Sequence, residues 1–396
     1  MGDGQHQVWR RGAGVFLALL LFCEAAEGGG GAVPTPAAAT LPLAGALSPE
    51  RWQQLEKSVD RALAWLAAQQ GADGSFPTAA AAQPAVTSLC VLAFLSRGHQ
   101  PGLGPYGGRL DRAIDFVISC QRPDGLFTYL PPEAMHQDGG ASHTAVYNHA
   151  IAGVMLGEVF GHVNGERMKQ VKQAIEQALQ FTRELQTRSK TFATDRGGWR
   201  YLRLRYDHSA YDSDLSITAW QLMFLRSARN AEFNVPQSYV NDGLDFVKRC
   251  WSPNRGIFYY ALSGNGGGVA GGRGMVGAGI LSLCLAGQHE APMVLAAGDW
   301  LLAHPFRQFG QPLGENDKFF YSAYYCSQAA AQLGGRYWQG IYPALSGVLL
   351  GAQLPDGSWP VDRSESDVQF LGKDYSTAMA VLSLTPPYQL LPIYQR

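Results

Sequence analysis

A short motif recurs along most of the chain, and it restricts the fold more than any other feature. Two copies share the same internal spacing: Arg61-Ala62, Trp65-Leu66, Gln70 and Asp73-Gly74-Ser75-Phe76, then Arg112-Ala113, Phe116-Val117, Gln121 and Asp124-Gly125-Leu126-Phe127. A third clear copy near the end contains Leu349, Gln353 and Asp356-Gly357-Ser358-Trp359. Weaker copies occur around Gln186 and Trp199, around Phe258, and between Trp300 and Tyr321. Such recurrence indicates a repeat architecture.

Each motif has a physical logic as the end of a helix. The Asp-Gly pair predicts a turn in which glycine adopts a positive φ, and the glutamine amide can bond the backbone groups that the helix end exposes. The aromatic residue after the glycine can then pack back over the helix end. The residues expected to hold the repeats together are Gln70, Gly74, Phe76, Gln121, Gly125, Phe127, Trp199, Gln353, Gly357 and Trp359.

A second, more apolar helix is expected after each turn. These helices are rich in Ala, Gly, Ser and Thr and carry few charges: Val86–Leu95, Thr144–Leu156, Ser216–Leu225, Met275–Leu285, Ser322–Ala331 and Tyr375–Leu384. A helix that is apolar nearly all round is buried on both sides. We therefore predict an all-α (α/α)6 toroid over residues 50–396, in which six outer helices surround six inner ones.

The pattern Arg-Ala, aromatic-aliphatic, Gln and Gly-x-aromatic resembles the QW motif of squalene and oxidosqualene cyclases, and the β subunits of protein prenyltransferases share related repeats. The resemblance implies a central cavity with the N-terminal ends of the inner helices at its mouth. The ionisable residues it places there are His143, Asp212, Asp214, Arg273, Lys318 and Asp374. Aromatic residues expected a turn further in are Tyr147, Trp220, Tyr324 and Tyr325. Aromatic walls suit a terpenoid ligand.

The catalytic acid of squalene–hopene cyclases lies in an Asp-x-Asp-Asp-Thr-Ala segment, and the similar stretch here is incomplete. Asp212-Ser213-Asp214 is followed by Leu215 where the last Asp belongs. The resemblance makes Asp214 the candidate acid, with Asp212 beside it. The alternative is that one of these aspartates caps the inner helix.

Zinc chemistry of the prenyltransferase type is not expected. The chain has no Asp-x-Cys pair, and Ser322 stands where the resemblance places the zinc-binding His. We predict no metal and no cofactor. A third enzyme class, a polysaccharide lyase, would use His143 and Tyr147 as base and acid and Arg273 to bind a uronate carboxylate. The alternative for these three residues is a packed, hydrogen-bonded role.

The N-terminus has the three parts of a secretory signal. Arg10 and Arg11 precede an apolar run, and small residues follow. We predict a signal peptide at 1–26, a linker at 27–49 and export, with a retained membrane anchor as the alternative. The balance of 31 Lys and Arg against 32 Asp and Glu argues against a nucleic-acid partner.

Three functions follow as expectations. The first is an exported protein that binds a lipid or terpenoid in a central cavity, with catalysis left open. The second is a non-catalytic scaffold or binding module that meets a membrane or protein partner, and the third is the lyase. A deep aromatic chamber would favour the first, and a ring filled with side chains would favour the second.

Overall fold

Residues 43–133, 139–202, 211–263, 267–314, 316–362 and 371–395 are described by a computed structural model. The predicted signal peptide at 1–26 and residues 27–42 of the predicted linker lie outside these ranges, so both stay predictions. The fold below is that of the unit Ala37–Arg396.

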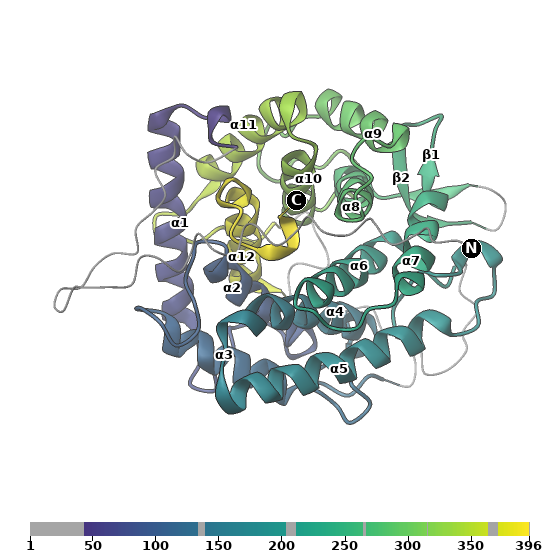
Figure 1. The fold of residues 1–396 in the computed structure, drawn as a ribbon. Coiled ribbons are helices and arrows are strands. Elements are labelled where there is room, and N and C mark those ends of the chain that lie inside the picture. The colour runs from purple at the N-terminus through teal and green to yellow at the C-terminus, as the bar shows by residue number, and fades with distance from the viewer. Residues whose placement is uncertain are drawn as a thin grey trace, which may run out of the picture. The chain divides into compact units, whose positions relative to one another are not determined.

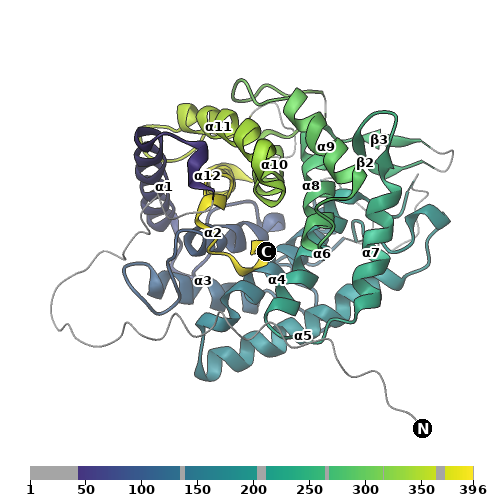
Figure 2. The same ribbon diagram turned by 45° about the horizontal axis from the view of Figure 1, so that its top comes forward.

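The predicted (α/α)6 toroid is confirmed within the described residues (Figures 1 and 2). The inner helices are α2 (Ala85–Leu95), α4 (Ala141–Val159), α6 (Leu215–Asn230), α8 (Gly272–Leu285), α10 (Phe319–Leu333) and α12 (Gly372–Leu384). The outer helices are α1 (Pro49–Gln69), α3 (Gly107–Ser119), α5 (Gly165–Thr187), α7 (Gln237–Arg249), α9 (Pro292–Ala303) and α11 (Gly335–Ala352). Each inner helix contacts the next one along the chain, and α12 contacts α2, which closes the ring.

The inner and outer helices differ in how much of their surface is buried, and their sequences explain the difference. Every residue of α2 is buried, because its sequence is apolar or small on all sides. Helix α1 instead buries one face through residues such as Leu55, Val59 and Leu66, and Ser48 caps its first turn. The inner ring is therefore the core, and the outer ring separates it from solvent.

Four repeat glutamines join neighbouring outer helices in the same way. Each side-chain amide donates to the carbonyl of its own turn glycine and to a carbonyl on the next outer helix, at 2.8–3.2 Å. The residues are Gln70, Gln121, Gln186 and Gln353. Gln353 donates to the Ser58 carbonyl of α1, so the last repeat is bonded to the first.

The turn glycines allow this close approach. Gly74 has a φ of +90°, and a Cβ there would lie 2.3 Å from the Arg112 carbonyl oxygen of the next outer helix. Gly197 repeats the arrangement against the Asp242 carbonyl, at 2.0 Å. The aromatic residues after the glycines are fully buried, and their N–H groups donate to side chains of the inner ring. These residues are Phe76, Phe127, Trp199 and Trp359.

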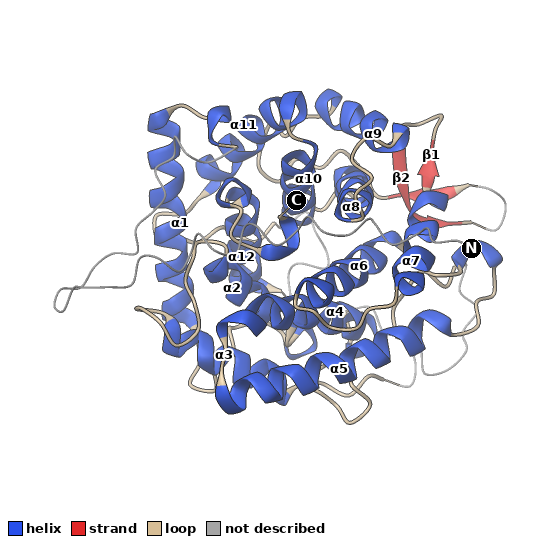
Figure 3. Cartoon of the chain, in the orientation of Figure 1, coloured by secondary structure: helices blue, strands red, loops and turns tan. Residues whose placement is uncertain are grey.

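A small sheet was not predicted from the sequence. Strands β1 (Trp251–Ser252), β2 (Ile257–Leu262) and β3 (Gly268–Ala270) form an antiparallel sheet in the order β1-β2-β3 (Figure 3). Strand β3 lies in a glycine-rich part of the chain, and Val269 and Gly271 line the cavity described below.

The C-terminal tail covers one end of the inner ring. It contains two 3-10 turns, η6 (Pro386–Tyr388) and η7 (Pro392–Tyr394), which contact α6, α10 and α12. Ile393 is fully buried, and its N–H donates to Glu158 at the end of α4. Figure 1 shows this end of the chain beside the inner helices. Among the described helices, none combines the length and the apolar character that a membrane span requires.

Candidate functional site

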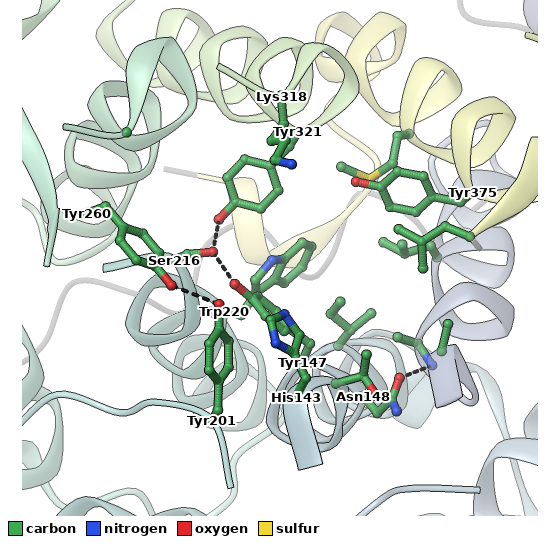
Figure 4. A pocket seen from close by; sticks show the side chains of 18 of the residues that line it. His143, Tyr147, Asn148, Tyr201, Ser216, Trp220, Tyr260, Lys318, Tyr321 and Tyr375 are labelled. Atoms are coloured by element: carbon green, nitrogen blue, oxygen red, sulfur yellow. Dashed lines mark hydrogen bonds between the residues drawn. The ribbon is translucent and has the colours of Figure 1, made fainter. Parts of the chain in front are cut away.

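The ring encloses a cavity of about 470 Å³ at the end opposite the C-terminal tail. All six inner helices contribute residues from their N-terminal halves, and the segments around Tyr201, Tyr260 and Val269 complete the wall (Figure 4). This volume is in the range of small-molecule sites. The predicted cavity mouth at the N-terminal ends of the inner helices is therefore present.

The deeper part of the wall is apolar. It is formed by side chains from five inner helices: Val86, Leu89, Ile151, Trp220, Met275 and Met379. Trp220 stacks on Tyr324 with ring centroids 5.4 Å apart, and the Tyr324 hydroxyl bonds the Tyr394 hydroxyl of the tail. The Trp220–Tyr324 stack therefore connects the cavity wall with Tyr394 at the covered end of the ring.

Hydroxyl groups lie on one side of the cavity. Ser216 at the start of α6 is within hydrogen-bond distance of Tyr147 (Oγ to Oη, 2.6 Å) and of Tyr321 (2.8 Å). Burial raises the pKa of both phenols above the usual value, so they remain protonated. Figure 4 shows this group facing the cavity, with Tyr375 across from it.

A second polar group borders the first. The Tyr201 and Tyr260 hydroxyls are 2.8 Å apart, and the Arg200 guanidinium donates to Tyr260 and to the Asp214 carboxylate. His143 stacks on Tyr201 with ring centroids 4.0 Å apart. The charge of Arg200 is therefore balanced by Asp214 behind the wall, and the cavity meets mainly phenol rings on this side.

Asp214, the predicted acid, does not line the cavity. It is fully buried, accepts the Ile217 N–H at 2.8 Å as the N-cap of α6, and pairs with Arg200 at 2.9 Å. Burial raises the pKa of Asp214 to about 6, against the opposing effect of Arg200. Asp212 accepts the Thr191 N–H, and its carbonyl accepts from Lys190. Asp214 thus occupies the N-cap position that the capping alternative gives to one of the two aspartates, and Asp212 bonds the segment around Thr191.

Arg273 is also absent from the cavity wall. It is 3% exposed and donates from Nε to Asp317 at 2.8 Å. Further bonds run to the carbonyls of Pro305 and Gln311. The guanidinium that the lyase hypothesis requires to bind a uronate carboxylate is therefore already paired with Asp317 and hydrogen-bonded to backbone carbonyls.

The remaining predicted residues divide between wall and core. His143, Tyr147 and Trp220 line the cavity, as does Lys318. Tyr324 and Tyr325 are buried beneath the wall, and Asp374 is buried beside α2, where its carbonyl lies 3.9 Å from the Cys90 thiol. Burial raises the pKa of Asp374 to about 7.

The sequence did not single out Ser216, Tyr321, Tyr201 or Tyr260 as site residues. A signal existed for Tyr321, which precedes Tyr324 and Tyr325 by three and four positions and so lies on the same side of α10. Tyr201 and Tyr260 lie outside the inner helices, and no periodic pattern marks them. Among the described residues, no group of three His, Cys, Asp or Glu side chains could hold a metal ion.

Comparisons with solved structures place the fold among known toroids. A variant of the type II terpene cyclase MstE from Scytonema, in complex with the substrate geranylgeranyl dihydroxybenzoate, matches with a TM-score of 0.54 and 15% identity. The match covers 86% of this chain and 99% of that one. D-mannose isomerase matches with a TM-score of 0.59 and 12% identity, over 85% of this chain and 96% of that one. An α-1,6-mannanase from Salegentibacter matches with a TM-score of 0.58 and 9% identity, over 85% and 99%. The chain is thus a terpene cyclase-like α/α toroid in its fold.

One sequence match adds to this. Drimenyl diphosphate synthase from Streptomyces showdoensis is 41% identical over 80 residues, which cover 20% of this chain and 14% of the synthase. No protein-family model matches the chain. Since both sugar-active and terpene-active proteins share the toroid, the fold alone does not assign a function.

Proposed function

We propose that this protein binds a terpenoid-like lipid in the central cavity, with the apolar chain of the ligand on the deeper wall. The observation that carries the proposal is the cavity itself, about 470 Å³ in volume and lined below its rim by Trp220, Leu89, Ile151 and Met379. Burial of apolar ligand surface against such side chains favours binding by roughly 25 cal/mol per Å² before the cost of association. The fold match to the type II terpene cyclase MstE and the 80-residue match to drimenyl diphosphate synthase support the same ligand class.

The proposal concerns binding and assigns no cyclisation. Protonation of an alkene needs a strong acid that faces the substrate. Among the described residues, the cavity wall contains no carboxyl group. Asp214 is separated from the ligand space by the residues around it and is paired with Arg200.

The two alternatives receive less support. A pure scaffold was expected to have a ring filled by side chains, whereas this ring holds a cavity. The lyase needs Arg273 at the site, and that side chain is paired with Asp317. Export through residues 1–26 remains part of the proposal, and N-terminal sequencing of protein recovered from the culture medium or the periplasm tests it.

Native mass spectrometry with prenyl ligands tests the binding proposal. β-Farnesene, farnesol and geranylgeraniol would be delivered from cyclodextrin to the full chain. We expect a one-to-one complex with at least one of the three. Leu89→Trp, which places a large ring into the cavity, should abolish it, and Leu295→Trp on the exposed face of α9 should not.

The folded state of both variants would be checked by circular dichroism and thermal unfolding. If no prenyl compound binds to the wild type, or if Leu89→Trp and Leu295→Trp bind equally well, the proposal is wrong.

A further inference from the structure

The hydroxyl cluster formed by Tyr147, Ser216 and Tyr321 contains more hydrogen-bond donors than it uses. Three hydroxyl groups carry three protons, and the two contacts among them use two. Either partner can donate in each contact, but every arrangement leaves one proton over. The ring of Tyr325 lies 4.7 Å from that of Tyr321. A hydrogen bond between their hydroxyls would add one proton and use one proton, so one surplus proton would still remain.

The surplus proton is directed to the cavity by the position of the cluster. All three residues line the cavity, and each comes from a different inner helix: α4, α6 and α10. Ser216 is 4% exposed, so bulk water has little access to the centre of the cluster. A buried donor without an acceptor is unfavourable, and a ligand oxygen can remove that cost.

The cluster itself carries no positive charge that would balance an anionic ligand. Burial keeps the Tyr147 and Tyr321 phenols protonated. The guanidinium of Arg200, which donates to Tyr260 of the cavity wall, is already paired with Asp214. The deeper wall offers mainly apolar contacts, with Val86, Leu89 and Met379 among the lining residues. The cavity is thus polar beside the cluster and apolar toward its deeper part.

We infer that the cavity ligand is an oxygenated isoprenoid whose neutral oxygen, in a hydroxyl, ether or carbonyl group, accepts a hydrogen bond from the Tyr147–Ser216–Tyr321 cluster. This inference rests on the proposed function and specifies the chemical class of its ligand. The oxygen lies at the level of the first turns of α6 and α10, and the hydrocarbon chain extends below it toward Trp220.

Three farnesyl compounds of matched length test the inference on the wild-type protein. β-Farnesene has no oxygen, farnesyl methyl ether has an acceptor only, and farnesol has an acceptor and a donor. One added neutral hydrogen bond should make the alcohol and the ether bind about three- to tenfold more tightly than the hydrocarbon. The ether should keep most of the gain, because the cluster supplies the proton.

The triple variant Tyr147→Phe/Ser216→Ala/Tyr321→Phe removes all three hydroxyls. We expect it to bind farnesol and the ether as weakly as β-farnesene, whose affinity should be unchanged. Unchanged hydrocarbon binding also reports an intact cavity. Tyr375→Phe, which removes a phenol hydroxyl from the opposite wall, is the matched control and should retain the preference for the oxygenated ligands.

The outcomes separate this inference from the proposed function. If neither these farnesyl compounds nor geranylgeraniol binds, the proposed function fails as well. If all three bind equally to the wild type, the cavity takes a prenyl chain but the inference is wrong. Farnesyl diphosphate that binds more tightly than farnesol, with the gain lost in Lys318→Gln, would also overturn it, because the head group would then be an anion at the rim.

Discussion

The two ends of the inner ring are built from the same six helices but treat their polar groups differently. At the covered end, the C-terminal tail supplies partners: the Ile393 N–H donates to Glu158, which also accepts from Ser227 of α6, and Gln332 donates to the Tyr394 carbonyl. At the open end, the cluster around Ser216 faces a cavity. At one end the tail therefore supplies partners for polar groups of the inner helices, and the other end leaves capacity for a ligand.

This difference indicates how a toroid can combine a stable core with a binding site. Buried polar groups that are fully partnered fix the structure around them, whereas partly partnered ones are poised for an external group. The covered end should therefore dominate stability, and the open end should dominate ligand affinity. Substitutions at matched positions can test this division.

The largest expected loss of stability comes from a substitution at Ile393, which is fully buried in the tail. Ile393→Ala should lower the free energy of unfolding by roughly 2–5 kcal/mol, through lost burial and the space left behind. Val269→Ala, at the cavity mouth and 38% exposed, should change it by less than about 0.5 kcal/mol. Urea unfolding followed by circular dichroism measures both. Equal losses would contradict the division between the two ends.

A pH dependence is expected from Glu158. Burial raises the pKa of this carboxyl from 4.5 to about 7, although Ser227 and the Ile393 N–H oppose the shift. Below pH 4.5 the group is protonated in both the folded and the unfolded state. As the pH rises toward 7, the unfolded chain ionises while the folded protein retains the proton, so stability is lost over this window and levels off above it.

Comparison with Glu158→Gln isolates this contribution. Between pH 4.5 and pH 8, the wild type should lose on the order of 3 kcal/mol of unfolding free energy that the variant keeps. Urea unfolding at several pH values measures the difference. Parallel pH profiles for the two proteins would show that Glu158 does not hold a proton in the folded state.

The smallest and most specific contrast concerns two tyrosines three residues apart on α10. The Tyr324 hydroxyl bonds Tyr394 of the tail, and the Tyr321 hydroxyl bonds Ser216 in the cavity. Tyr324→Phe should lower the free energy of unfolding by about 1 kcal/mol, because Tyr394 loses its partner. Tyr321→Phe should change it by about half as much or less, since its hydroxyl faces the cavity. Thermal unfolding of the two variants measures both losses. A larger loss for Tyr321→Phe than for Tyr324→Phe would show that the Tyr324–Tyr394 contact does not stabilise the core.

Much of the fold could be predicted because each copy of the repeat contains the residues that end a helix and form the following turn. The spacing of Gln70, Gly74 and Phe76 recurs at Gln121, Gly125 and Phe127. In both sets the glutamine amide donates to the glycine carbonyl, and the phenylalanine N–H donates to a side chain of an inner helix. The short sheet could not be predicted in this way. Strand β3 is three residues long and lies in a glycine-rich stretch without alternation.

The candidate site was harder to predict because its residues meet only when the ring closes. Tyr147, Ser216 and Tyr321 come from three helices, separated by 69 and 105 residues in the chain. For Asp214, the same residue type serves as a helix cap or as an acid, and only its burial and its pairing with Arg200 separate the two. Arg273 likewise pairs with Asp317, which lies 44 residues further along the chain and could not be identified as its partner from the sequence.

Photo-crosslinking tests most directly whether the open end of the ring is the binding site. A farnesol analogue with a diazirine at the far end of its hydrocarbon chain would be irradiated with the protein, and the labelled residues identified by mass spectrometry. We predict labels on the deeper wall, at Leu89, Ile151, Trp220 or Met379, that an excess of farnesol suppresses. Labels confined to the outer groove between α5 and α7, around Met168 and Tyr239, or labels that farnesol does not suppress, would contradict the account.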